Sequence, residues 1–175
     1  MIGDDQSNTY FNAGNAKTSP PSIGASAFAC FNVQQNAAIK VTASVGSSSF
    51  LGLCIAEFSG TYGTNSGAGI DGVGTSFGNS SAPTSGNLAT TQDNLLYLGV
   101  VTANADGFVV TEESGWTRLC SLTGRMSVGS PISVEYRTAI AGTYAAMWTS
   151  GATVLWTAGL FTFLPSASVP LSPQP

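Results

Sequence analysis

Apolar residues recur along this chain at alternating positions or in short runs, separated by Gly, Ser, Thr, Asn and Pro. No window of a dozen residues keeps the apolar spacing i, i+3, i+4, i+7 of an amphipathic helix. The pattern therefore predicts an all-β chain. The expected strands are residues 25–33, 38–45, 50–58, 94–103, 108–111, 115–122, 132–140, 143–148 and 153–163, with weaker patterns at 70–77 and 85–90.

Clusters of turn-forming residues lie between expected strands at 46–49, 104–107 and 149–152. Each cluster has the chemistry of a tight turn, so each predicts a hairpin of two antiparallel strands. Nine or more strands joined by short turns predict two packed antiparallel sheets. We therefore expect a β-sandwich of jelly-roll or immunoglobulin-like type.

Two expected strands, 95–101 and 153–163, are apolar at successive positions, so both of their faces are apolar. Each is therefore expected in the middle of a sheet or beneath a covering segment.

A length of 175 residues favours one domain, residues 1–164. Residues 165–175 contain four prolines and are expected to form an extended tail.

Composition narrows the possible chemistry, because the chain has no histidine, nine acidic residues and five basic residues. Histidine is the usual general base near neutral pH and the commonest transition-metal ligand. Its absence excludes Ser-His-Asp and Cys-His catalytic sites and makes an enzyme the less favoured interpretation. The basic residues are scattered, whereas nucleic-acid binding needs a clustered basic surface, so no nucleic-acid partner is expected.

The sequence also bears on location. Its longest apolar stretch, 154–164, is interrupted by polar residues and is shorter than the roughly 20 residues of a membrane-spanning helix. Asp4 and Asp5 stand where a secretion signal is positively charged, so no signal peptide is visible.

Three cysteines, Cys30, Cys54 and Cys120, are expected to be small buried thiols, with one bridged pair as the alternative.

Five short segments occur in an order that resembles a family of β-sandwich accessory domains, found in large bacterial surface proteins and in phage structural proteins. They are DDQSNTY (4–10), AEFSG (56–60), SGWT (114–117), VEY (134–136) and GTYAAMW (142–148). The resemblance spans residues 4–163 and implies a sandwich fold with no catalytic signature. Domains of this kind have strands before the first segment, so the resemblance predicts a sheet edge that another chain fills or that the chain's own termini close.

Several groups of residues are candidates for chemistry. Residues 74–78, GTSFG, match the G-x-S-x-G pattern of a serine nucleophile but lack a histidine base. If the protein is an enzyme, carboxylates remain, and Glu57 shares a strand face with apolar neighbours, where burial would raise its pKa. Glu135 and Arg137 share one strand face and are expected to form a surface ion pair. The candidate catalytic acids are Glu57, Asp71 and Glu135, with Asp93 as a further partner.

Two further sites are expected from residue type. Calcium is a possible cofactor, with the oxygen ligands Asp4, Asp5 and Asn8, although Asp and Asn at turns more often cap their own backbone. The candidate ligand-binding residues are the aromatic side chains Trp148, Trp156 and Tyr144. If 143–148 and 153–163 form a hairpin, the two tryptophans face opposite sides of the sheet, and the one outside the core offers a platform for a glycan or a neighbouring subunit.

These observations favour a non-enzymatic structural or binding module of a virion or cell surface, acting in assembly, decoration or glycan binding. Its expected partners are further copies of itself or a neighbouring structural protein. The alternative is a small hydrolase without histidine that uses carboxylates, with or without calcium, on a glycoside, ester or lactone.

Overall fold

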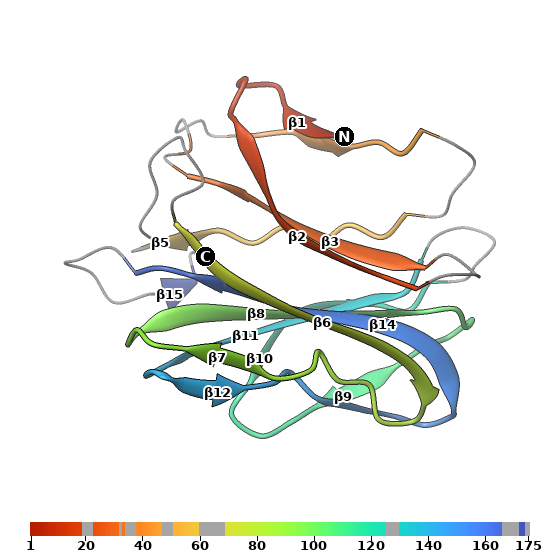
Figure 1. The fold of residues 1–175 in the computed structure, drawn as a ribbon. Helices are drawn as coiled ribbons and strands as arrows, with labels where there is room; N and C mark the ends of the chain where they lie inside the picture. The colour runs from red at the N-terminus through yellow and green to blue at the C-terminus, as the bar shows by residue number, and fades with distance from the viewer. Residues whose placement is uncertain are drawn as a thin grey trace.

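The computed structural model is all-β, as the sequence predicts, with no helix among the residues that it describes (Figure 1). Those are residues 1–18, 23–31, 33, 38–46, 51–59, 69–124, 130–165 and 172–173. The strands are β1 (Ile2–Asp4), β2 (Tyr10–Lys17), β3 (Gly24–Cys30), β4 (Val41–Ala43), β5 (Phe58–Ser59), β6 (Ile70–Ser80), β7 (Leu88–Thr90), β8 (Leu95–Ala103), β9 (Val110–Glu112), β10 (Thr117–Leu122), β11 (Ile132–Ala139), β12 (Gly142–Tyr144), β13 (Trp148–Ser150), β14 (Val154–Phe163) and β15 (Ser172–Pro173).

The centre of the fold is a five-stranded antiparallel sheet in the order β10-β11-β8-β14-β6. β8 and β14 occupy interior positions and are buried along almost their whole length. Burial on both faces explains why these two strands are apolar at successive positions. This confirms the expectation that each lies centrally with its outer face covered.

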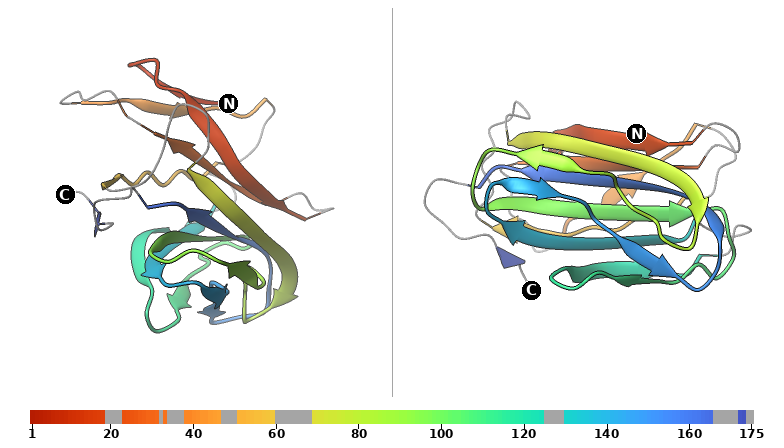
Figure 2. Two further views of the ribbon diagram at one scale, coloured as in Figure 1. Left: turned by 60° about the vertical axis from the view of Figure 1, so that its left-hand side comes forward. Right: turned by 60° about the horizontal axis from the view of Figure 1, so that its bottom comes forward.

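The two faces of this sheet line two separate hydrophobic cores. On β14, Leu160 belongs to one core and Phe161 to the other, because successive side chains of a strand point to opposite faces. The first core also takes Val101 and Trp148, while the second takes Val134. Figure 2 shows the covering strands, with β2 and β3 on one side of the sheet and β7 and β12 on the other.

The layer over the first core is built from short strands in three chain segments. β12 pairs with β7, β13 pairs with β9, and a bridge joins Thr84 to Met147. Trp148 N donates to Pro83 O and Ser150 N donates to Ser81 O, so 142–150 runs between 81–90 and β9. We call these segments, 81–90, 110–112 and 142–150, the second layer.

The layer over the second core includes the β2–β3 pair, and the sequence did not predict β2. Its residues YFNAGNAK place only small apolar side chains, Ala13 and Ala16, in buried positions, so the alternation of polarity is weak. Gly14 has a φ of 154°, and a Cβ there would lie 2.7 Å from Val73 Cγ2. β2 therefore crosses the sheet at a distance that only glycine permits.

Two hairpin predictions are wrong, because the flanking strands belong to different sheets. The turn at 104–107 leads from β8 in the five-stranded sheet to β9 in the second layer, and 149–152 leads from β13 back to β14. The third predicted turn, 46–49, lies largely outside the described residues. The expected strand at 143–148 is divided into β12 and β13, and of the one expected at 50–58 only Phe58 is strand.

The favoured expectation of three free thiols is also wrong, and the alternative of one bridged pair is the one that the structure has. Cys54 and Cys120 form a disulfide with their Cα atoms 6.3 Å apart, and Cys30 is free. Cys54 lies in a segment without strand pairing, which sequence reasoning took for a strand. The bond ties that segment to β10, across a sequence separation of 66 residues.

The first prediction concerns this disulfide. Unfolded protein should titrate one thiol before reduction and all three afterwards, because only Cys30 is free. The double substitution Cys54→Ser with Cys120→Ser should lower the free energy of unfolding in urea by about 4 kcal/mol, since the bond closes a loop of 66 residues. Cys30→Ser is the control and should change stability far less. Three reactive thiols in unreduced protein would contradict the bond.

Candidate functional site

The inner face of β11 carries a row of polar side chains: Ser133, Glu135 and Arg137. They share a face because they are two residues apart on one strand, and this face points toward the first core. Ser133 Oγ, both Glu135 carboxylate oxygens and Arg137 Nε are buried and have no hydrogen-bond partner among the described residues. Such atoms are rare inside folded proteins, so this row is the most unusual chemistry of the described chain.

Glu135 is completely enclosed, with 0% of its surface exposed. It lies opposite Gly99 of β8. A Cβ on Gly99 would lie 2.7 Å from the Ala146 Cβ and 3.1 Å from the Glu135 Cγ. Glycine at this position thus leaves the space in which the glutamate side chain meets the second layer.

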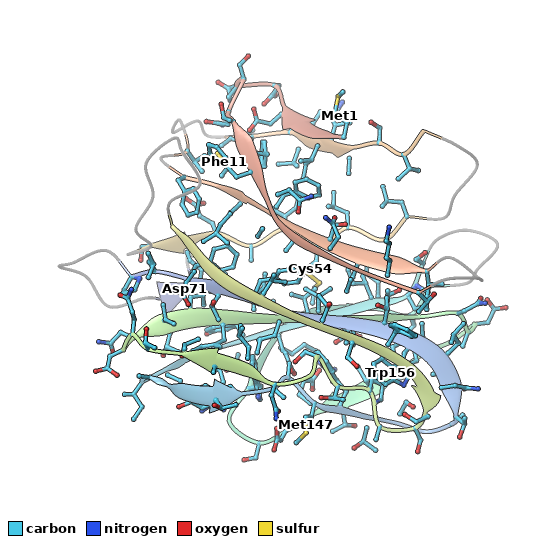
Figure 3. The ribbon with its side chains drawn as sticks, viewed as in Figure 1. Met1, Phe11, Cys54, Asp71, Met147 and Trp156 are labelled. Carbon is cyan, nitrogen blue, oxygen red and sulfur yellow. A yellow bond between two sulfur atoms is a disulfide. The ribbon has the colours of Figure 1, made fainter. Side chains whose placement is uncertain are left out.

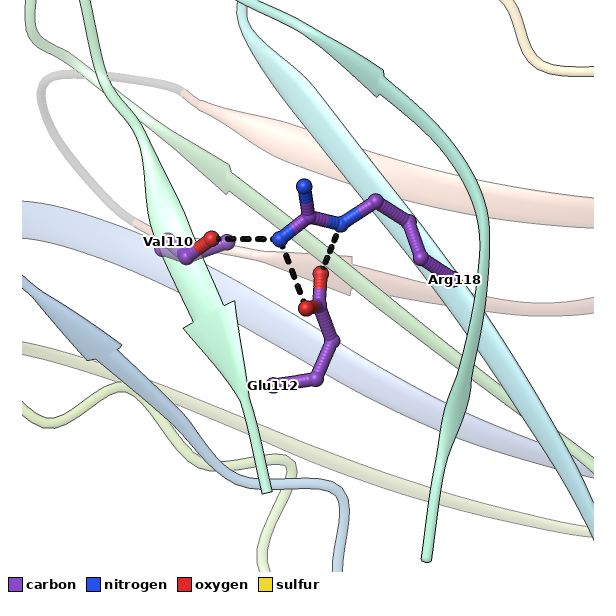
Figure 4. A network of polar contacts seen from close by, with 3 residues as sticks. All are labelled: Val110, Glu112 and Arg118. Atoms are coloured by element: carbon purple, nitrogen blue, oxygen red, sulfur yellow. Dashed lines mark hydrogen bonds and ion pairs between the residues drawn. The ribbon is translucent and has the colours of Figure 1, made fainter. Parts of the chain in front are cut away.

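A second carboxylate, Glu112 of β9, lies close to this row and is held by an arginine (Figure 4). Arg118 of β10 forms an ion pair with Glu112 through Nε, and its Nη2 donates to Glu112 Oε2 at 2.6 Å. The same Nη2 donates to the Val110 carbonyl at 2.9 Å. This clamp joins the second layer to the edge strand of the five-stranded sheet.

The environments of the two carboxylates push their pKa values apart. Burial, together with the charges of Glu112 and Glu113, raises the pKa of Glu135 from 4.5 to about 8, while Arg118 and the Trp148 indole act in the opposite direction. The indole lies outside hydrogen-bonding geometry. For Glu112, partial burial also acts to raise the pKa, but the hydrogen bond from Arg118 overcomes it and lowers the value.

A protonated acid beside an ionised carboxylate is the arrangement of an acid/base pair. Here it lies inside a core, because Glu135 has no exposed surface and its neighbours Ser133 and Trp148 are buried. A substrate would have to separate the layers to reach it. The protonation of Glu135 therefore affects the stability of the fold, in which Glu135 is a neutral acid at neutral pH.

The predicted ion pair of Glu135 with Arg137 is wrong, since the ion pair among the described residues joins Glu112 to Arg118. The Arg137 guanidinium instead stacks over aromatic rings, 4.8 Å from the Tyr144 centroid and 5.5 Å from the Trp116 centroid. Cation–π contact with Tyr144 of the second layer and with Trp116, between β9 and β10, takes the place of a carboxylate partner here.

The three candidate catalytic acids are not brought together. Glu57 is exposed, so the expected burial does not occur, and its neighbour Phe58 packs on Tyr136 at the sheet face opposite Glu135. Asp71 belongs to β6, which is separated from β11 by two strands. Its Oδ2 accepts a hydrogen bond from Thr162 at 3.1 Å. Asp93, on the turn before β8, accepts one from Ala141 N at 2.8 Å.

The aromatic candidates lie in the first core. Trp148 and Trp156 are 2% and 4% exposed and belong to one cluster, so the expectation that they face opposite sides of a sheet is wrong. It assumed a hairpin, whereas β13 and β14 lie in different layers and direct both indoles into the space between them. Trp156 Nε1 donates to Ser80 Oγ at 3.0 Å, near the end of the β6–β14 ladder away from Asp71 (Figure 3). Tyr144 is half-buried against Tyr97, with ring centroids 5.0 Å apart.

Of the calcium candidates, Asn8 is hydrogen-bonded to Asp4, whereas the Asp5 carboxylate accepts from Lys40 N and Gln6 Nε2. The Asp4 carboxylate accepts hydrogen bonds from Gln6 N, Asn8 N, Asn8 Nδ2 and the Tyr10 hydroxyl, at 2.8 to 3.1 Å. Burial acts to raise the pKa of Asp4, and these donors lower it overall. A cation would compete with four donors for the oxygens of one carboxylate.

The segment 74–78 lies in the middle of β6, where no turn presents Ser76 as a nucleophile. β6 is an edge of the five-stranded sheet, and among the described strands it pairs only with β14. Thr157 Oγ1 donates to Ser76 O and Thr162 Oγ1 donates to Gly72 O, so the carbonyls of even-numbered residues point toward β14. Successive residues alternate in this direction, so Val73, Thr75 and Phe77 direct their N–H and C=O groups outward.

Side chains at this edge are exposed as well. Val73 is 45% exposed and Phe77 is 61% exposed, both on one face of β6. Asp71 is the one charged residue among the 11 of the strand. A long edge with unpaired backbone groups, apolar side chains and a single charge can pair with another chain. Sequence reasoning treated this segment as a possible enzyme motif and missed the edge, because only sheet order shows which strand is outermost.

Comparison with known proteins returned no match: no family model, no curated protein and no solved structure matches this chain. Within the described ranges, no helix has the length and hydropathy to cross a membrane. The same ranges contain no group of three or more His, Cys, Asp or Glu placed to hold a metal ion.

The second prediction concerns Glu135 and pH. The folded state keeps the Glu135 proton up to about pH 8, whereas the unfolded chain releases it near pH 4.5. The stabilisation is therefore complete below pH 4.5 and is lost as the pH rises to 8, at up to about 1.4 kcal/mol per pH unit. Urea unfolding at a series of pH values should show this decline.

The matched variant is Glu135→Gln, which copies the neutral acid and should lose most of the decline between pH 5 and 8 while remaining folded. Glu112 and Asp4 have lowered pKa values, so their contributions are lost only as the pH falls below the usual carboxylate range. An equal decline in the variant and the parent protein would show that Glu135 is not the responsible group.

Proposed function

We propose that this chain is a non-enzymatic structural module that assembles through the edge of its five-stranded sheet. The observation that carries the proposal is β6, an 11-residue edge strand with outward backbone groups and with Val73 and Phe77 exposed. Soluble proteins usually protect such edges with charges, proline or bulges in the exposed part. From Gly72 to Ser80, β6 pairs with β14 in continuous register and carries no charge or proline, so it is suited to a partner strand.

The architecture that we propose is a two-sheet sandwich of jelly-roll type. Tyr97 and Val101 from the five-stranded sheet and Ala146 and Trp148 from the second layer enclose one core, which supports two facing layers. The chain passes from the five-stranded sheet into the second layer directly after Ser80, returns at 91–94 and passes back at 104–109. Frequent crossings of this kind are typical of jelly rolls rather than of simple meanders.

The setting that we propose is a virion or an extracellular surface. The Cys54–Cys120 disulfide supports it, since disulfides persist in oxidising environments. A phage or cell-surface decoration component and a glycan-binding module are both compatible with a surface of few charges. The buried positions of Trp148 and Trp156 favour assembly over glycan stacking.

The hydrolase alternative is less well supported. Its candidates Glu57, Asp71 and Glu135 lie apart, and the acid with the raised pKa is enclosed in a core. Calcium at Asp4, Asp5 and Asn8 remains a prediction for either function.

The third prediction tests assembly. Light scattering of the purified protein at micromolar concentration should give a mass above the 17.7 kDa of one chain. Phe77→Lys should reduce that mass to 17.7 kDa, because a lysine at an exposed edge opposes strand pairing. Its stability should change by less than about 0.5 kcal/mol, as is usual for an exposed position.

Ile140→Lys provides the matched control, since Ile140 is 65% exposed but lies in a turn away from β6. This variant should keep the mass of the parent protein. A parent protein that is monomeric under these conditions, or equal loss of assembly in both variants, would contradict assembly through β6.

A further inference from the structure

We infer that the partner of β6 is the β6 strand of a second copy, paired antiparallel about a two-fold axis at Thr75. This inference rests on the proposed function and specifies its partner and register. The result would be one continuous sheet of ten strands, five from each copy. Pairing of identical edges is the simplest closed association that a chain can make with itself.

The backbone allows this register. Val73, Thr75 and Phe77 are the residues whose N–H and C=O groups point outward, as the contacts of Ser76 and Gly72 with β14 show. In an antiparallel pair centred on Thr75, Thr75 lies opposite Thr75 of the second copy and Val73 lies opposite Phe77. Each such pair joins two outward residues, so every pair can exchange both of its hydrogen bonds.

The side chains also favour this register. Val73 and Phe77 are the exposed large apolar residues of β6, and centring on Thr75 places each against the other, twice by symmetry. An aromatic residue opposite a β-branched one is a favourable cross-strand pair. Asp71 falls opposite Asn79 rather than opposite another acid, so no like charges meet across the pair.

Other registers satisfy fewer of these conditions. A half-residue shift of the axis would place outward residues opposite residues already bonded to β14, leaving their backbone groups unpaired. An axis at Phe77 would stack the two phenylalanines but would place Val73 opposite the exposed polar residue Ser81. A second copy centred on Thr75 uses the whole edge from Val73 to Phe77.

Cysteine cross-linking tests the register in the full chain carrying Cys30→Ser, which leaves the disulfide of Cys54 and Cys120 intact. Thr75→Cys should form a covalent dimer rapidly under mild oxidation, because directly opposed Cα atoms in a hydrogen-bonded pair are about 5.5 Å apart, within disulfide range. Thr149→Cys is the matched control, an exposed strand threonine in the second layer, and should form at least ten-fold less dimer in the same time.

A mixture of Thr75→Cys and Asn79→Cys chains distinguishes the alternatives. Excess cross-linking between the two different chains would place the axis at Phe77 and overturn the register, while leaving assembly through β6 intact. An assembly that persists in light scattering with no cross-linking in any of these chains would overturn the pairing of two β6 strands. A monomeric parent protein would overturn the proposed function as well, so the failures are distinguishable.

Discussion

The fold depends on a five-stranded sheet that is covered on both faces. β8 and β14 lie in its interior, and their side chains alternate between two separate cores, as Leu160 and Phe161 do. The buried polar side chains of these two strands are hydrogen-bonded, as in Tyr97, whose hydroxyl lies 2.6 Å from Thr90 Oγ1. The second layer is built from strands that pair over three residues each, so its stability comes mainly from packing on this sheet.

Close approach of the layers explains why small residues recur in a chain with few charges. Gly99 admits Ala146 and Glu135 on one face of the sheet, and Gly14 admits Val73 and Phe161 on the other. Burial of Glu135 then follows from geometry: the space beside Gly99 accommodates a glutamate, and protonation is the least costly way to keep it there. The raised pKa of Glu135 thus results from packing. The exposed apolar side chains Val73 and Phe77 lie elsewhere, on the edge strand β6.

The sequence predicts those features of the fold that depend on the local pattern of polar and apolar residues along a strand. The all-β class and the strands β8, β11 and β14 follow from local pattern, and their bounds agree with it closely. Pairing could not be predicted in this way, because a turn such as 104–107 has the same chemistry whether the next strand stays in the sheet or crosses to another layer. The two tryptophans were misplaced for this reason, and so was Glu135, whose burial depends on strands remote in sequence.

The two edges of the five-stranded sheet are unlike, and this difference limits how far the sheet can grow. At β10 the register is interrupted between Arg118 and Cys120, the Arg118 side chain is bound to β9, and Cys120 is cross-linked. A bulge, a charge and a cross-link at this edge each oppose the pairing of an added strand. With one edge open and the other closed, two copies joined as we propose would leave no open edge in the shared sheet, so the product would be a finite pair rather than a fibre.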